Sequence, residues 1–184
     1  MSGAPATPSQ TVGPFFELGM SGLTATDITG GATGRAITVR GTVFDGHGQP
    51  VPDAVLETWQ ADPAGTYVRL PSRAGAFRGF ARLATDEAGR FQLRTLMPGR
   101  VDGPNGVHQA PHVLVAIFMR GLLKHLVTRI YFAGEQANET DPVLKLVEPA
   151  RRETLIAARD AEHGDVFIWH VRLQGPGETV FLDV

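Results

Sequence analysis

Polar and apolar residues alternate along several short stretches of the chain. Over residues 37–44, apolar residues and one glycine occupy every second position, and Thr38, Arg40 and Thr42 separate them. A second alternating stretch covers residues 91–95. Successive side chains of a β-strand point to opposite faces, so this period of two predicts half-buried strands.

Further stretches have the composition of strands, and turn residues separate them. They are rich in β-branched and other apolar residues and span residues 55–61, 77–83, 112–118, 126–132, 166–173 and 179–182. Glycine (22) and proline (13) make up 35 of 184 residues, about 19% against a typical ~12%, which favours many turns. Short strands at close spacing predict an all-β protein, built as a two-sheet β-sandwich.

One segment departs from this pattern. Residues 148–160 have Pro149 near their start, and Arg152, Leu155 and Arg159 follow helical spacing. Proline is favoured in the first turn of a helix, so we expect one short helix here.

The chain reads as one domain with an extended N-terminal region. A length of 184 residues suits a single core, so we expect one domain over 1–184, with an N-terminal arm and loop over 1–36. The adjacent Phe15 and Phe16 follow a small, polar and proline-rich stretch. They indicate either a frayed terminus or an arm whose two phenyl rings are covered by another surface.

Composition excludes several classes of function. The net charge is −2 with mixed signs, which gives no electrostatic reason to expect binding of nucleic acid or of an anionic membrane. The absence of cysteine excludes disulfides and thiolate chemistry. No signal peptide and no membrane span are evident in the sequence, so we expect a soluble cytoplasmic protein.

Few residues offer chemistry by spacing alone. His108 and His112 lie close enough to chelate a metal, but the spacing supplies no third ligand. Tyr67 follows a turn at a strand end, where an exposed loop tyrosine is the simplest interpretation. Arg120 follows the apolar run 113–119; it is either a surface residue or a contact for a carboxylate or a partner chain.

Four segments carry a resemblance to the intradiol ring-cleaving dioxygenases. The segment 7–16 (TPSQTVGPFF) resembles the family's N-terminal motif, and 57–62 (ETWQAD), followed by Gly65 and Tyr67, resembles its strand and turn. Residues 91–99 and 128–132 resemble two later segments, and the order agrees from Thr7 to Val184. The resemblance implies a β-sandwich and the opening of a dihydroxylated aromatic ring by O2.

The resemblance also implies where iron ligands would stand. Catalytic members bind ferric iron through two tyrosines and two histidines, which fall here on Tyr67, Val101, His112 and Leu114. Hydrocarbon side chains have no lone pair, and ferric iron prefers oxygen and imidazole donors. We therefore expect no metal and no catalytic residue in this chain, with Tyr67 and His112 as vestigial ligand positions.

The family includes a hetero-oligomer in which an α subunit lacks the ligands and a homologous β subunit holds the ferric iron. Segments 151–156 and 174–181 resemble that α subunit, which implies cleavage of protocatechuate with O2 to 3-carboxy-cis,cis-muconate, in the β-ketoadipate pathway. Residues Thr11, Pro14, Phe15 and Arg120 match α positions near the partner's substrate pocket.

The sequence is also compatible with two alternatives. One is a self-sufficient catechol-type dioxygenase or hydrolase that uses His108, His112 and an Asp. The other is a non-catalytic β-sandwich binding module.

Overall fold

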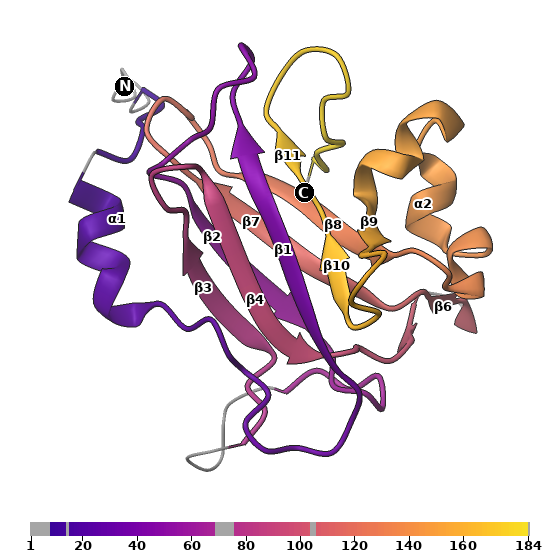
Figure 1. Cartoon of the computed structure of the whole chain (residues 1–184). Coiled ribbons are helices and arrows are strands. Elements are labelled where there is room, and N and C mark those ends of the chain that lie inside the picture. Colours follow the sequence, from indigo (N-terminus) through magenta and orange to yellow (C-terminus); the bar gives the residue numbers. More distant parts are fainter. Residues whose placement is uncertain (1–7, 14, 69–75, 104–105, 184) are drawn as a thin grey trace, which may run out of the picture.

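A computed structural model describes residues 8–13, 15–68, 76–103 and 106–183 (Figure 1). Its strands are β1 (Ala36–Phe44), β2 (Val55–Gln60), β3 (Phe80–Ala84), β4 (Arg90–Leu96), β5 (Val101–Asp102), β6 (His108–Gln109), β7 (His112–Phe118), β8 (Leu126–Phe132), β9 (Ile156–Arg159), β10 (Val166–Ile168) and β11 (Val171–Arg172). Its helices are α1 (Phe15–Met20) and α2 (Pro142–Leu146), with 3-10 helices η1 (Ser21–Leu23), η3 (Gln136–Glu139) and η4 (Pro149–Leu155).

Nine of the strands form one continuous hydrogen-bonded sheet. Its order is β11-β1-β10-β9-β8-β7-β2-β3; β4 pairs with β1, and β5 and β6 form a separate two-stranded sheet. In Figure 1, β1, β4 and β10 pass in front of β2, β7 and β8. The all-β class is confirmed. The division into two sheets stays a prediction, because β9 pairs with both β8 and β10 and so joins the front and back strands.

The apolar core lies between these front and back strands. The alternation predicted for β1 is confirmed, because Ile37, Val39 and Val43 are at most 1% exposed. A side chain at Gly41 would place its Cβ 1.7 Å from the Trp169 carbonyl oxygen, which explains a glycine in mid-strand. The core therefore needs both the alternation and one position without a side chain.

The helix expected over 148–160 is only partly correct. A 3-10 helix, η4, covers its first half, and the second half is strand β9, whose Ala157 is fully buried. Strand β9 hydrogen-bonds to β8 and β10, so pairing in the sheet outweighs the helical spacing.

Other elements also differ from expectation. The segment 179–182 forms only an isolated bridge to β8, and the expected strand 166–173 is divided into β10 and β11. Strands β5 and β6, which precede β7, pair antiparallel and were not among the expected strands. The N-terminal region contains α1, and α2 was not anticipated, although Asp141 before Pro142 is a regular helix start.

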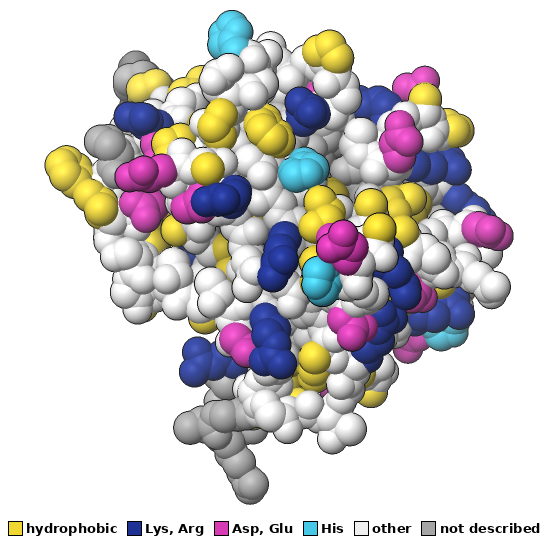
Figure 2. Space-filling model, in the orientation of Figure 1, with side chains coloured by type: hydrophobic (Ala, Val, Ile, Leu, Met, Phe, Trp, Pro, Cys, Tyr) yellow, Lys and Arg dark blue, Asp and Glu magenta, His cyan; other side chains and the backbone are white. Residues whose placement is uncertain are grey.

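The surface carries charges of both signs and an apolar N-terminal edge. Figure 2 shows Lys and Arg side chains interspersed with Asp and Glu, and hydrophobic side chains that project at the α1 edge. Phe15 is 77% exposed, and Leu18 and Leu23 are each 61% exposed. Within the part of the chain that the structure describes, no helix has the length and apolar character needed to cross a bilayer.

Candidate functional site

The candidate residues lie at opposite ends of β7. His112 begins this strand, and Arg120 follows its last residue, Phe118, by two positions. At about 3.3 Å per residue, eight residues of extended chain span roughly 25 Å. We call the first group, Tyr67, Val101, His112 and Leu114, the residual-ligand site. The second group, Thr11, Phe15, Phe16 and Arg120 with their contacts, is the arm corner.

In the residual-ligand site, the structure brings Tyr67 and His112 together. The Tyr67 hydroxyl lies 3.3 Å from Nε2 of His112, and Nδ1 of His112 lies 2.7 Å from the Ala110 carbonyl oxygen. Because a carbonyl only accepts, Nδ1 carries the proton and Nε2 offers its lone pair to the Tyr67 hydroxyl. Trp59 packs edge-on against Tyr67, with ring centroids 6.5 Å apart.

The other two positions supply only hydrocarbon. Val101 lies in β5 and is 4% exposed. Leu114 lies two residues after His112, on the same face of β7, and is paired with Trp59 of β2. Val101 and Leu114 have no donor atom, which leaves only Tyr67 and His112, so the four family positions do not fit ferric iron.

His108 does not complete a metal site either. Its Nδ1 lies 2.8 Å from a carboxylate oxygen of Asp102, across the β5–β6 hairpin, whereas both ring nitrogens of His112 have other partners. Among the described residues, no group of three or more His, Cys, Asp or Glu side chains could hold a metal ion. The hypothesis of a chelate between His108 and His112 therefore lacks support.

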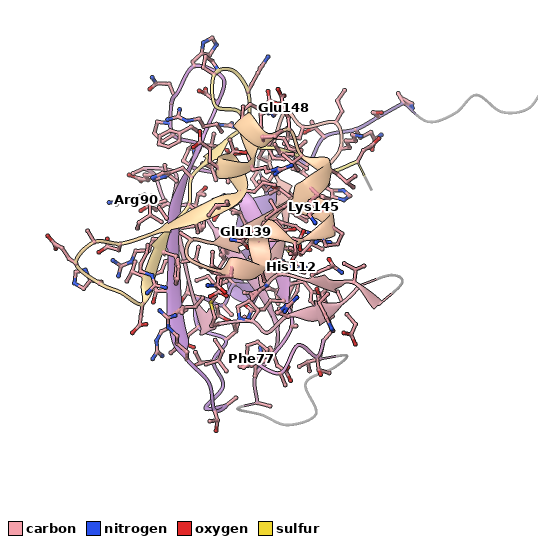
Figure 3. All side chains as sticks on the ribbon, turned by 90° about the vertical axis from the view of Figure 1, so that its right-hand side faces the viewer. Phe77, Arg90, His112, Glu139, Lys145 and Glu148 are labelled. Carbon is pink, nitrogen blue, oxygen red and sulfur yellow. The ribbon has the colours of Figure 1, made fainter. Side chains whose placement is uncertain are left out.

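A hydrogen-bond network that spacing did not reveal lies beside this site. Nη1 of Arg129 lies 2.7 Å from Oε1 of Gln109 and 3.3 Å from the Tyr131 hydroxyl. That hydroxyl donates to Oδ1 of Asp141 at 3.0 Å, and both Tyr131 and Asp141 are fully buried. In the view of Figure 3, His112 lies beside Glu139 of η3 and Lys145 of α2.

Burial and the charge of Arg129 set the protonation states. Burial lowers the pKa of His112, and the Arg129 charge lowers it further, against smaller opposing effects of the Ala110 carbonyl and Asp141. Burial raises the pKa of Tyr67, and Arg129 opposes this rise. Burial also raises the pKa of Tyr131. Both residual ligand side chains are therefore neutral near pH 7.

We predict that acid destabilises the fold through His112. Below its ordinary pKa of 6.5, the unfolded chain binds a proton that the folded chain resists, so the free energy of unfolding falls as the pH drops. The slope for one such group is at most about 1.4 kcal/mol per pH unit. Chemical denaturation between pH 7.5 and 5 measures it.

The control for this prediction is His112→Gln, which removes the titrating group. Burial also lowers the pKa of His170, so the wild-type slope contains its contribution as well. We expect the variant to have a smaller slope than the wild-type chain. Equal slopes would show that His112 does not contribute.

At the arm corner, the N-terminal arm meets the turn after β7. The Gly121 backbone N–H donates to Oγ1 of Thr11 at 2.8 Å. The Phe16 ring lies 5.8 Å from that of Phe118, centroid to centroid. Phe15 remains exposed, and Pro14 lies outside the described residues. The hydrogen bond of Thr11 therefore holds the arm against the turn that contains Arg120.

Arg120 has an acidic partner that the sequence did not reveal. Its Nε lies 2.6 Å from Oδ2 of Asp53; the Arg120 side chain is 63% exposed, and that of Asp53 is 21% exposed. Strand β2 pairs antiparallel with β7, and Val55 lies opposite Phe118. Extending this register by two residues places Asp53 opposite Arg120, so the sheet itself creates the pair.

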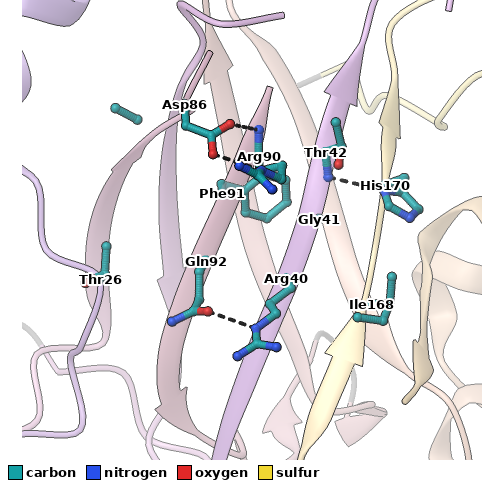
Figure 4. A pocket seen from close by; sticks show the side chains of 11 residues that line it. Thr26, Arg40, Gly41, Thr42, Asp86, Arg90, Phe91, Gln92, Ile168 and His170 are labelled. Atoms are coloured by element: carbon teal, nitrogen blue, oxygen red, sulfur yellow. Dashed lines mark hydrogen bonds and ion pairs between the residues drawn. The ribbon is translucent and has the colours of Figure 1, made fainter. Parts of the chain in front are cut away.

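A hollow on the described surface lies away from both groups of candidate residues. It has a volume of about 480 Å³ and lies over the outer face of β1, β4 and β10 (Figure 4). Its lining includes Arg40 bonded to Gln92 and Arg90 bonded to Asp86. None of the candidate residues lines it. The arm corner and the residual-ligand site are therefore not part of this hollow.

Comparisons with known proteins assign the family. A protein family described as "Dioxygenase" matches residues 16–175. The protocatechuate 3,4-dioxygenase alpha chain of Burkholderia cepacia is 45% identical over 97% of this chain and 97% of its own length. The beta chain from the same organism is 34% identical over 67% of this chain and 56% of its own.

A solved structure agrees with the fold. It is the dioxygenase domain of a dioxygenase–carbohydrate-binding protein fusion from Streptomyces sp. SirexAA-E, 28% identical, with a TM-score of 0.64 over 85% of this chain and 89% of that chain. This chain belongs to the intradiol ring-cleaving dioxygenase family. Members of the family use ferric iron. Within it, the chain is similar over nearly its whole length to protocatechuate 3,4-dioxygenase alpha chains, which come from an enzyme with alpha and beta chains.

Proposed function

We propose that this chain is the α subunit of a protocatechuate 3,4-dioxygenase and that a homologous β subunit holds the ferric iron. The observation that carries the proposal is the residual-ligand site. Val101 and Leu114 offer no lone pair, and the remaining Tyr67 and His112 are hydrogen-bonded to each other. A chain with this donor set needs a partner to supply the metal centre.

The proposed role of this chain is to form one wall of the partner's substrate pocket. Thr11, Pro14 and Phe15 of the arm provide a largely apolar surface, and Arg120 provides a positive charge for the carboxylate of protocatechuate. The Thr11–Gly121 hydrogen bond supports this role, because it ties the arm to the Arg120 turn. The assembly would use O2 to open the ring between the two hydroxyls, giving 3-carboxy-cis,cis-muconate.

The exposed residues of α1 and η1 support a partner at the same edge. Phe15, Leu18 and Leu23 are each more than half exposed on the single chain. Obligate interfaces are large and apolar, so these side chains are suited to burial between subunits. The proposal includes a cytoplasmic location and one domain over residues 1–184.

We predict that activity requires both chains. The chain is produced alone and together with a β subunit of this family, and iron content, colour and O2 uptake on protocatechuate are measured. We expect iron and O2 uptake only in the co-produced complex, and poor solubility of the chain alone.

Other outcomes decide between the alternatives. Iron and O2 uptake by the chain alone would establish a self-sufficient dioxygenase. Failure to form a complex, with no activity in either preparation, would favour a binding module and contradict the proposal.

A further inference from the structure

Arg129 lies in β8, on the strand that pairs with the part of β7 in the residual-ligand site. In the antiparallel pair β7–β8, Arg129 lies directly opposite Leu114, and Tyr131 lies opposite His112. Directly paired residues share one face of a sheet. The guanidinium therefore shares a face with a position that the family uses for an iron ligand.

Within the part of the chain that the structure describes, no direct ion pair neutralises the charge of this guanidinium. Among the described residues, its hydrogen-bond acceptors are the neutral Oε1 of Gln109 and the Tyr131 hydroxyl. Its Nε is buried and has no partner within the described part of the chain. Arginine remains protonated in proteins, so a permanent positive charge acts on Tyr67 and His112.

We infer that Arg129 excludes metal cations from the residual-ligand site, independently of the two lost ligands. The inference rests on the proposed function in taking the four family positions as the ligand set. A histidine placed at Leu114 would face the guanidinium across the β7–β8 pair, and a metal bound to it would lie beside a fixed cation. Restoring the ligands alone would therefore not restore the site.

This exclusion would have a consequence for the assembly. Two homologous chains fold in the same cell, and both carry parts of one metal-binding pattern. The positive charge of Arg129 in this chain directs iron to the other chain alone. This chain then excludes metal, rather than binding it weakly.

The test compares iron per αβ pair in complexes that carry variants of the full chain. Val101→Tyr and Leu114→His restore the ligand types, and the same pair is then combined with Arg129→Gln or with the charge-retaining control Arg129→Lys. We expect one iron per pair in the wild-type, the ligand-restored and the Lys complexes. We expect a second iron, with increased visible absorption from tyrosinate–iron bonds, only in the Gln complex.

A simpler variant covers the case in which the multiple substitutions do not fold. Leu114→His alone is combined with Arg129→Gln or Arg129→Lys, and Zn²⁺ binding is measured by calorimetry after thermal unfolding has verified the fold. We expect at least ten-fold tighter binding in the Gln variant.

Three results would overturn the inference. They are a second iron in the ligand-restored complex that keeps Arg129, equal metal binding by the Gln and Lys variants, and no additional binding in any variant. A wild-type complex without iron would instead contradict the proposed function.

Discussion

Replacing Asp141 with alanine is expected to lower the free energy of unfolding by about 3–5 kcal/mol. The Asp141 carboxylate is fully buried and accepts four hydrogen bonds. Oδ1 accepts from the backbone N–H groups of Val143 and Leu144, at 2.9 and 2.8 Å, which caps α2. It also accepts from the Tyr131 hydroxyl, and Oδ2 accepts from the Ala110 N–H at 2.8 Å.

The expected size follows from the donors that alanine would leave without partners. Loss of a helix N-cap costs about 1 kcal/mol, up to about 2. A buried donor without a partner costs about 1–3 kcal/mol, and both the Ala110 N–H and the Tyr131 hydroxyl would lose theirs. Because β8, α2 and the start of β7 meet at this carboxylate, the substitution affects all three.

Two variants separate these contributions, with urea unfolding as the measurement. Asp141→Asn keeps the shape and one acceptor oxygen, so we expect a smaller loss, about 1–2 kcal/mol. Tyr131→Phe removes one donor and leaves the cap, and we expect it to cost less than Asp141→Ala. A loss below about 1 kcal/mol for Asp141→Ala would contradict the importance given to this carboxylate.

The sequence predicted strands well where burial alone decides the structure. Strands β7 and β8 have the boundaries expected from their apolar runs, and β1 has the expected alternation. Strand β9 was missed because its residues also satisfy helical spacing, and only pairing with β8 and β10 decides between the two. A local pattern of apolar residues therefore predicts a strand only where it does not fit helical spacing as well.

The sequence predicted which positions belong to the candidate site, but it did not predict the contacts that the residues there make. Family motifs identified Tyr67 and His112, which are 45 residues apart and lie within hydrogen-bonding distance. Asp53 and Arg129 were not identified, because their importance depends on the residue opposite each of them in the sheet. Register is a property of strand pairing, which one sequence does not reveal.

In the complex with the β subunit, Arg120→Ala is expected to raise the KM for protocatechuate about ten-fold or more and to change kcat little. A guanidinium that binds a substrate carboxylate contributes equally to the ground state and the transition state, because the carboxylate does not react. Steady-state O2 uptake measures both constants. Unchanged kinetics would remove Arg120 from the pocket.

Asp53 allows a sharper test of the same arrangement. It binds Nε of Arg120, so the two terminal nitrogens of the guanidinium can be directed at a carboxylate. Removing Asp53 has two opposite effects on the KM for protocatechuate. The repulsion of the anionic substrate decreases, which lowers KM, whereas the orientation of Arg120 is lost, which raises it. The two effects are separable because asparagine keeps an acceptor oxygen without the charge.

If orientation dominates, Asp53→Ala raises KM about three-fold or more, and Asp53→Asn leaves it unchanged or lowers it. If only charge matters, both variants lower KM by the same factor. The inhibition constant of catechol, which lacks the carboxylate, is the control and is expected to be the same in all three complexes. A catechol constant that rises together with KM would mean that Asp53 supports the shape of the pocket wall rather than the direction of Arg120.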